Sequence, residues 1–165
     1  MATRHSLFSM HGLADRRAAR RPSAYPVSTS KKIPSSAPSM AYSTNNAAGQ
    51  AVQNIINELP QLLAVAIVDT TSGMTLASHT NSPALNPDTA AAYNTEVVKQ
   101  KQKAMAALKL QGEQIDDILI TLTNQLHLIN LIDGGKKFIY LAVNARDTNL
   151  AIARDVLRQQ VDLLK

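Results

Sequence analysis

The stretch LLAVAIVDTTSGMTLASH, residues 62–79, carries the clearest structural signal in the sequence. Its first seven residues are all apolar and rich in β-branched side chains, which is typical of a strand covered on both faces. Residues 69–73 have the composition of a tight turn, with Gly73 available for a positive φ. Residues 74–79 then alternate in polarity and predict an antiparallel partner strand. The stretch therefore predicts a β-hairpin inside a covered sheet.

A helical pattern precedes this hairpin. Apolar residues recur at helical spacing over residues 47–59, and either Asn45 or Asn46 can cap the start. Pro60 disfavours the helical conformation of the residue before it. We therefore expect a first helix over residues 47–59.

A longer helix follows the hairpin. Asn86 and Pro87 provide a cap and a first helical residue, and no Gly or Pro interrupts residues 88–111 before Gly112. The predicted helix has about 24 residues and a length of about 36 Å. Its apolar residues form one stripe, which comprises Tyr93, Val97, Ala104 and Leu108 and is widened by Val98 and Met105. Its lysines, Lys99, Lys101 and Lys103, are separated by glutamines and predict a solvated face rather than a phosphate site.

The remaining sequence predicts a three-stranded meander and a last helix. Strands are expected over residues 115–122, 126–132 and 138–143, and the sequence DGGK at 133–136 favours a hairpin between the last two. Asp147 or Thr148 can cap the last helix. Its core stripe comprises Leu150, Ala153, Leu157, Val161 and Leu164, with Arg154, Arg158 and Asp162 on the outer side. The order α-β-β-α-β-β-β-α predicts an α/β (α+β) domain over residues 47–165, in which one five-stranded antiparallel sheet has helices packed on its faces.

Residues 1–46 differ in composition from this domain. They hold seven of the 17 Lys and Arg and one of the 12 acidic residues, which leaves ten bases and eleven acids for the domain. The net charge of +5 thus divides into +6 for the segment and −1 for the domain. We expect this Ser- and Pro-rich segment to be a disordered tail. Three hypotheses remain open: a solvated tail or sequence upstream of the true start, an organellar transit peptide, and a patch for nucleic acid or anionic membrane.

The sequence offers little catalytic chemistry. It has no cysteine, its four histidines do not recur at metal-ligand spacing, and it has no glycine-rich nucleotide loop. His79 and His127 are interpreted as surface or satisfied side chains, and Ser72, His79 and Asp69 as an accidental Ser/His/Asp set. No apolar run approaches the roughly 20 residues that span a membrane. We expect no catalytic, metal or cofactor site, no small-molecule substrate and a cytoplasmic location, organellar if the tail is a transit peptide.

The order and spacing of these elements resemble the Roadblock (dynein light chain) family over residues 47–165. The resemblance rests on residues 63–78, on IDDILIT at 115–121, on DGGKKFIYL at 133–141 and on LAIAR at 150–154. This sequence has Ala66 where family members often have glycine. The resemblance implies a non-enzymatic protein that binds or regulates a small Ras-like GTPase, as bacterial gliding-motility partners do, or serves as a dynein light chain or scaffold subunit.

The resemblance also implies a homodimer or heterodimer in which the third strands pair edge to edge and the long helices lie side by side. Independently, the aliphatic strand at 115–122 would promote aggregation if its edge stayed unpaired. The expected interface residues are Asp117, Ile118, Leu119, Ile120, Thr121, Val97, Lys101, Ala104 and Leu108. The competing hypotheses are a nucleic-acid- or membrane-associated protein acting through the basic tail, and a structural subunit of a larger complex.

Overall fold

The computed structural model describes residues 42–165, so the predicted tail lies outside the described residues except for its last five positions. The predicted element order α-β-β-α-β-β-β-α and the antiparallel five-stranded sheet are confirmed. A single 3₁₀ turn, η1, interrupts this order between the last two strands. The elements are α1 (Ala47–Glu58), β1 (Ala64–Asp69), β2 (Thr75–Thr80), α2 (Pro87–Ala107), β3 (Asp117–Thr121), β4 (Gln125–Ile132), η1 (Asp133–Gly135), β5 (Lys137–Asn144) and α3 (Leu150–Leu164).

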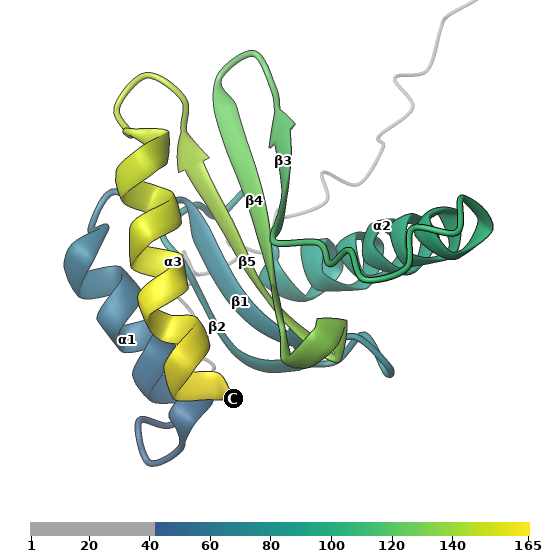
Figure 1. Cartoon of the computed structure of the whole chain (residues 1–165). Coiled ribbons are helices and arrows are strands. Elements are labelled where there is room, and N and C mark those ends of the chain that lie inside the picture. The colour runs from purple at the N-terminus through teal and green to yellow at the C-terminus, as the bar shows by residue number, and fades with distance from the viewer. Residues whose placement is uncertain (1–41) are drawn as a thin grey trace, which may run out of the picture. The chain divides into compact units, whose positions relative to one another are not determined.

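The sheet has the strand order β2-β1-β5-β4-β3 and lies between two helical layers (Figure 1). Helices α1 and α3 cover one face, where Val65 and Ile67 of β1 are buried in the larger apolar cluster. Helix α2 lies on the opposite face, over Ala64, Ala66 and Val68. Successive residues of a strand point to opposite faces, so the uninterrupted apolar run of β1 reflects burial on both sides, as predicted.

Asparagine side chains cap each of the three α-helices within residues 42–165. Asn46 accepts a hydrogen bond from the backbone N–H of Gly49 at 2.8 Å, and Asn86 caps α2 as predicted. The predicted cap of the last helix was wrong: α3 begins after Asn149, whose Oδ1 accepts from the N–H of Ala151 at 2.9 Å. Asp147 and Thr148 instead lie in the connection between β5 and α3, and only the residue directly before the helix reaches its free N–H groups.

Helix α2 is shorter than predicted and ends at Ala107 rather than at residue 111. The N–H of Lys109 donates to the carbonyl of Ala106, and the N–H of Leu110 donates to that of Met105, each at 3.1 Å. These two bonds form a Schellman motif, which requires a left-handed residue after the cap. Lys109 takes that conformation with φ 55°. Glycine is the usual residue at this position, and because Lys109 stands there the sequence gave no sign that the helix ends before Gly112.

The strand boundaries also differ from the prediction by a few residues. The third strand comprises only Asp117–Thr121 of the expected 115–122. The predicted hairpin at 133–136 is confirmed, since Ile132 pairs with Lys137, and its turn is the 3₁₀ element η1. At the N-terminal side, Tyr42 packs against the α1–α3 cluster and its hydroxyl donates to Oε1 of Gln53 at 2.8 Å. The folded chain therefore begins before residue 47.

Candidate protein-binding surface

Strand β3 forms one edge of the sheet, and no strand in the described part of the chain lies beyond it. It bonds only to β4, with Leu119 opposite Leu128. Ile118 and Ile120 pack toward the cluster beneath α2, whereas Leu119 packs on the face covered by α1 and α3. All three remain only half-buried, and Thr121 is exposed. The strand thus combines apolar side chains on both faces with an unpaired backbone edge.

Helix α2 buries only part of the apolar surface that its sequence provides. Its buried residues are Ala91, Asn94, Thr95 and Val98. The predicted stripe lies on a different face and is exposed, with exposed fractions of 75% for Tyr93, 39% for Val97 and 69% for Leu108. The sequence suggested that Val98 widens this stripe, but Val98 lies on the buried face of α2 and the stripe on the exposed face. The protomer's own core does not explain why these apolar residues are present.

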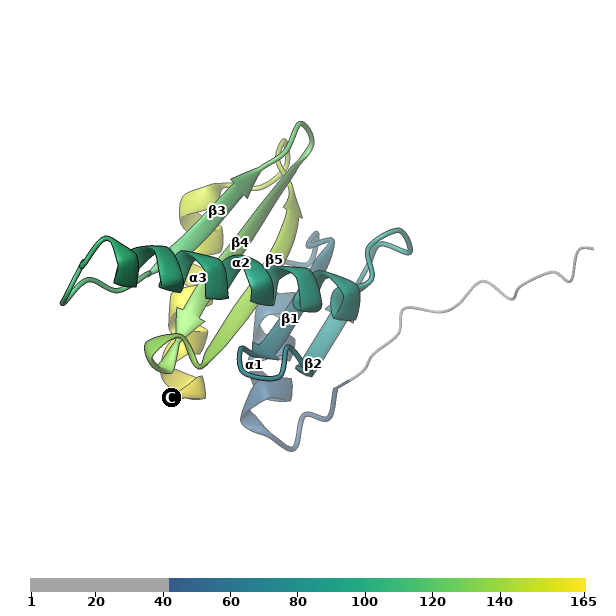
Figure 2. The ribbon, with the colours of Figure 1, turned by 90° about the vertical axis from the view of Figure 1, so that its right-hand side faces the viewer.

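A shallow groove of about 520 Å³ joins the exposed face of α2 to the edge strand. In Figure 2, α2 runs across the sheet from the β2 side toward and past β3. The groove is lined by Glu96, Val97, Gln100, Lys101, Ala104 and Ile118. Four of the nine residues expected at an interface thus line one surface. Leu108 lies at the end of α2, outside the groove.

Asp117 contributes a charge to the same edge, on the opposite face. Its two carboxylate oxygens accept hydrogen bonds from Arg154 of α3, from Nε at 2.8 Å and from Nη2 at 3.0 Å. The Asp117 side chain is only 13% exposed, and that of Arg154 is 34% exposed. The hydrogen bonds that Arg154 donates to Asp117 raise the pKa of the guanidinium above its ordinary value. The sequence placed Arg154 on the outer side of the helix and gave no sign of this pairing, because the partners are 37 residues apart.

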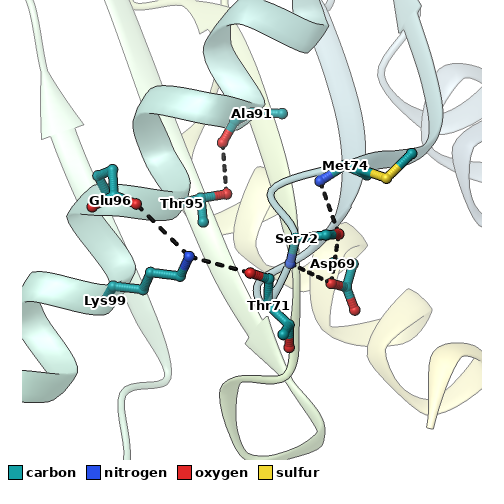
Figure 3. A network of polar contacts seen from close by, with 8 residues as sticks. All are labelled: Asp69, Thr71, Ser72, Met74, Ala91, Thr95, Glu96 and Lys99. Atoms are coloured by element: carbon teal, nitrogen blue, oxygen red, sulfur yellow. Dashed lines mark hydrogen bonds and ion pairs between the residues drawn. The ribbon is translucent and has the colours of Figure 1, made fainter.

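The turn between β1 and β2 is a polar network that is tied to α2 (Figure 3). Oδ1 of Asp69 accepts hydrogen bonds from the N–H and hydroxyl of Ser72, both at 2.8 Å. The backbone bond from Ser72 holds the pKa of the Asp69 carboxyl below its usual range. Lys99 donates to the carbonyl of Thr71 at 3.3 Å and pairs with Glu96 at 3.7 Å. Lys99 is therefore half-buried and structural, whereas Lys101 and Lys103 are exposed as predicted.

The two histidines within residues 42–165, His79 and His127, do not assemble with catalytic partners. His79 is buried and its Nε2 lies 2.9 Å from Oδ1 of Asn81, at the opposite end of the hairpin from Asp69 and Ser72. His127 bonds to Gln125 and to the Tyr140 hydroxyl. Burial lowers the pKa of His127. Within residues 42–165, no three His, Cys, Asp or Glu side chains converge as a metal site would require.

Helices of membrane-spanning length and apolarity are absent from residues 42–165. Helix α2 has 21 residues, but its charged and amide side chains make it too polar for that role.

Comparison with known proteins identifies the fold by structure and not by sequence. No family model matches the sequence, and no curated protein matches it. A Roadblock/LC7 domain from Streptomyces avermitilis superposes with a TM-score of 0.58 at 14% identity, covering 68% of this chain and 90% of that one. The gliding protein MglB of Thermus thermophilus gives 0.59 at 16% identity, covering 78% and 95%. MglB in a tetrameric arrangement gives 0.60 at 17% identity, covering 78% and 94%.

These similarities define the class of fold. Residues 42–165 adopt the Roadblock/LC7 fold, which confirms the fold that the element order suggested. The similar structures include MglB, whose chains are spanned almost completely by this domain.

Proposed function

We propose that this protein is a non-catalytic, dimeric protein-binding module that acts on a small Ras-like GTPase. The observation that carries the proposal is the groove that joins the unpaired β3 edge to Val97 and Ala104 of the exposed α2 stripe. An apolar edge strand left open is a template for unwanted pairing. Pairing with a second copy removes that hazard and covers the stripe with the same step.

Symmetry determines how the two copies meet. Two β3 strands related by a two-fold axis perpendicular to the sheet pair antiparallel, so the two sheets become continuous. The same axis places the two α2 helices antiparallel on one face of that sheet. Ala104, the smallest residue of the groove, allows the helix backbones to approach closely there. The MglB structure with a tetrameric arrangement supports self-association as a property compatible with this fold.

The GTPase part of the proposal rests on the resemblance to the Roadblock family and on the structural similarity to MglB gliding proteins. A dimer of this kind offers its partner a wide, continuous sheet and a helix pair.

Sedimentation of the full chain tests the dimer. We expect twice the protomer mass of 17.8 kDa at micromolar concentration. A single species at the protomer mass over the whole micromolar range would remove the dimer and the function that depends on it.

Affinity capture tests the partner. The purified chain is immobilised and incubated with extract of its source cells containing GDP or a non-hydrolysable GTP analogue, and any captured Ras-like GTPase is then purified and titrated. We expect saturable binding that differs between the two nucleotide states. Binding equal in both states, or no GTPase captured, contradicts the proposal.

A truncated chain separates this function from one that depends on the N-terminal segment. The cut belongs before Tyr42 because Tyr42 packs on the core and Asn46 caps α1. A chain of residues 42–165 should retain GTPase binding. If the truncated chain loses it while remaining folded, binding depends on the basic tail.

A further inference from the structure

The ion pair between Arg154 and Asp117 differs from the other three ion pairs among the described residues. Those three join side chains three positions apart on the chain surface. Arg154 and Asp117 instead join α3 to the first residue of the edge strand and make two hydrogen bonds of 2.8 and 3.0 Å. Planar, bidentate pairing of this kind fixes orientation as well as charge.

The position of Asp117 makes its charge critical when a second copy binds. In the protomer, the Asp117 side chain lies at the open edge and is 13% exposed, so water reaches part of it. Pairing of β3 with another β3 covers this edge. A carboxylate that loses its remaining water is strongly destabilised unless a cation is bonded to it.

We propose that Arg154 is a positioning residue for dimerisation, which holds and neutralises the Asp117 carboxylate so that β3 can accept a second copy of this chain. This inference rests on the proposed dimer. Without Arg154, the carboxylate of the free protomer regains water, whereas that of the dimer remains uncompensated at the interface. The loss therefore falls mainly on association and less on the fold.

The test measures dimer dissociation constants of full-length variants by sedimentation equilibrium. We expect Arg154→Ala to raise the dissociation constant about tenfold or more, since two such pairs are lost for each dimer. The double variant Asp117→Asn/Arg154→Ala carries no charge at the pair and should return to within about threefold of the wild type. Arg158→Ala is the matched control, because Arg158 is exposed one helical turn further along α3 and, among the described residues, forms no ion pair.

The dissociation constant of the folded Arg154→Ala variant distinguishes this role from a contribution to folding alone. If the pair only stabilised the protomer, the double variant would dimerise as the wild type does, and so would Arg154→Ala once folded, as judged by circular dichroism. Arg154→Lys keeps the cation but not the two-pronged bond and should weaken the dimer several-fold. A dimeric wild type with unchanged dissociation constants for Arg154→Ala and Arg154→Lys overturns this inference and leaves the proposed function standing. A monomeric wild type overturns both.

Discussion

Substituting Ala104 by glutamate tests the helix contact of the proposed dimer without disturbing the protomer. Ala104 is exposed in the protomer and lines the groove beside β3. Alanine and glutamate are both good helix formers, so the free energy of protomer unfolding should change by less than about 0.5 kcal/mol. Any large effect must then come from association.

The magnitude follows from the geometry of packed helices. Axes of packed helices lie about 8–10 Å apart, so two symmetric carboxylates about 9 Å apart repel by roughly 2 kcal/mol at an effective dielectric constant of about 20. Crowding of the larger side chains adds about 1 kcal/mol. Together, about 3 kcal/mol corresponds to a dissociation constant raised about 100-fold.

Salt separates the two contributions. At about 1 M salt the screening length falls to about 3 Å, so the repulsion should largely vanish and an increase of only about fivefold should remain. Sedimentation equilibrium of the full chain at low and high salt measures both values. Ala92→Glu is the control, because Ala92 is an exposed alanine of the same helix outside the groove. If Ala104→Glu dimerises as tightly as Ala92→Glu does, the α2 helices do not meet at Ala104 and the reasoning fails.

Three further substitutions test the protomer. Lys109→Gly should stabilise it by about 0.5–1 kcal/mol, which is a rise of about 2–4 °C in melting temperature, because glycine adopts the φ of 55° without the penalty that Lys109 bears. An unchanged or lower melting temperature contradicts this account of the helix end. Asn149→Ala should cost about 1 kcal/mol in urea unfolding, since it removes the cap of α3, and a loss below about 0.3 kcal/mol would show that the cap is unimportant. Burial raises the pKa of Tyr140 from 10.0 to about 12, so Tyr140 ionises in the unfolded chain first and the free energy of unfolding should fall between pH 10 and pH 12. Tyr140→Phe should lack that decline, and an equal decline in both proteins would assign it to other groups.

Local sequence patterns predicted the elements whose apolar residues are buried in the chain's own core. In β1 every residue from Ala64 to Val68 faces one apolar layer or the other, so the continuous apolar run is an unambiguous signal. In α3 the predicted stripe faces α1 and the sheet, with Ala153, Leu157 and Leu164 buried. These patterns arise because the side chains are buried in the chain's own core, so apolar residues recur with the period of the strand or helix.

The helix caps and ends were less predictable because several residues compete for one role. Asp147, Thr148 and Asn149 are all good capping residues in succession, and only the path of the turn selects Asn149. Lys109 gave no signal of a helix end because lysine is a good helix former. Arg154 and Asp117 meet only through the packing of α3 beside β3, so no local pattern could indicate their bond.

Helix α2 shows why the sequence alone could not separate apolar residues that are buried in the core from apolar residues that are available to a partner. Its alanines fit either environment, and Val97 and Val98 are adjacent, identical and differently placed: Val98 is fully buried, whereas Val97 is 39% exposed. A period of 3.6 residues reports that a face is apolar and not what covers it. Once the structure assigns Val98 to the core, the exposed Tyr93, Val97 and Leu108 require another explanation. Of these three, Val97 lines the groove that joins α2 to the β3 edge, and the proposed association with a second copy would account both for this exposed side chain and for the open edge.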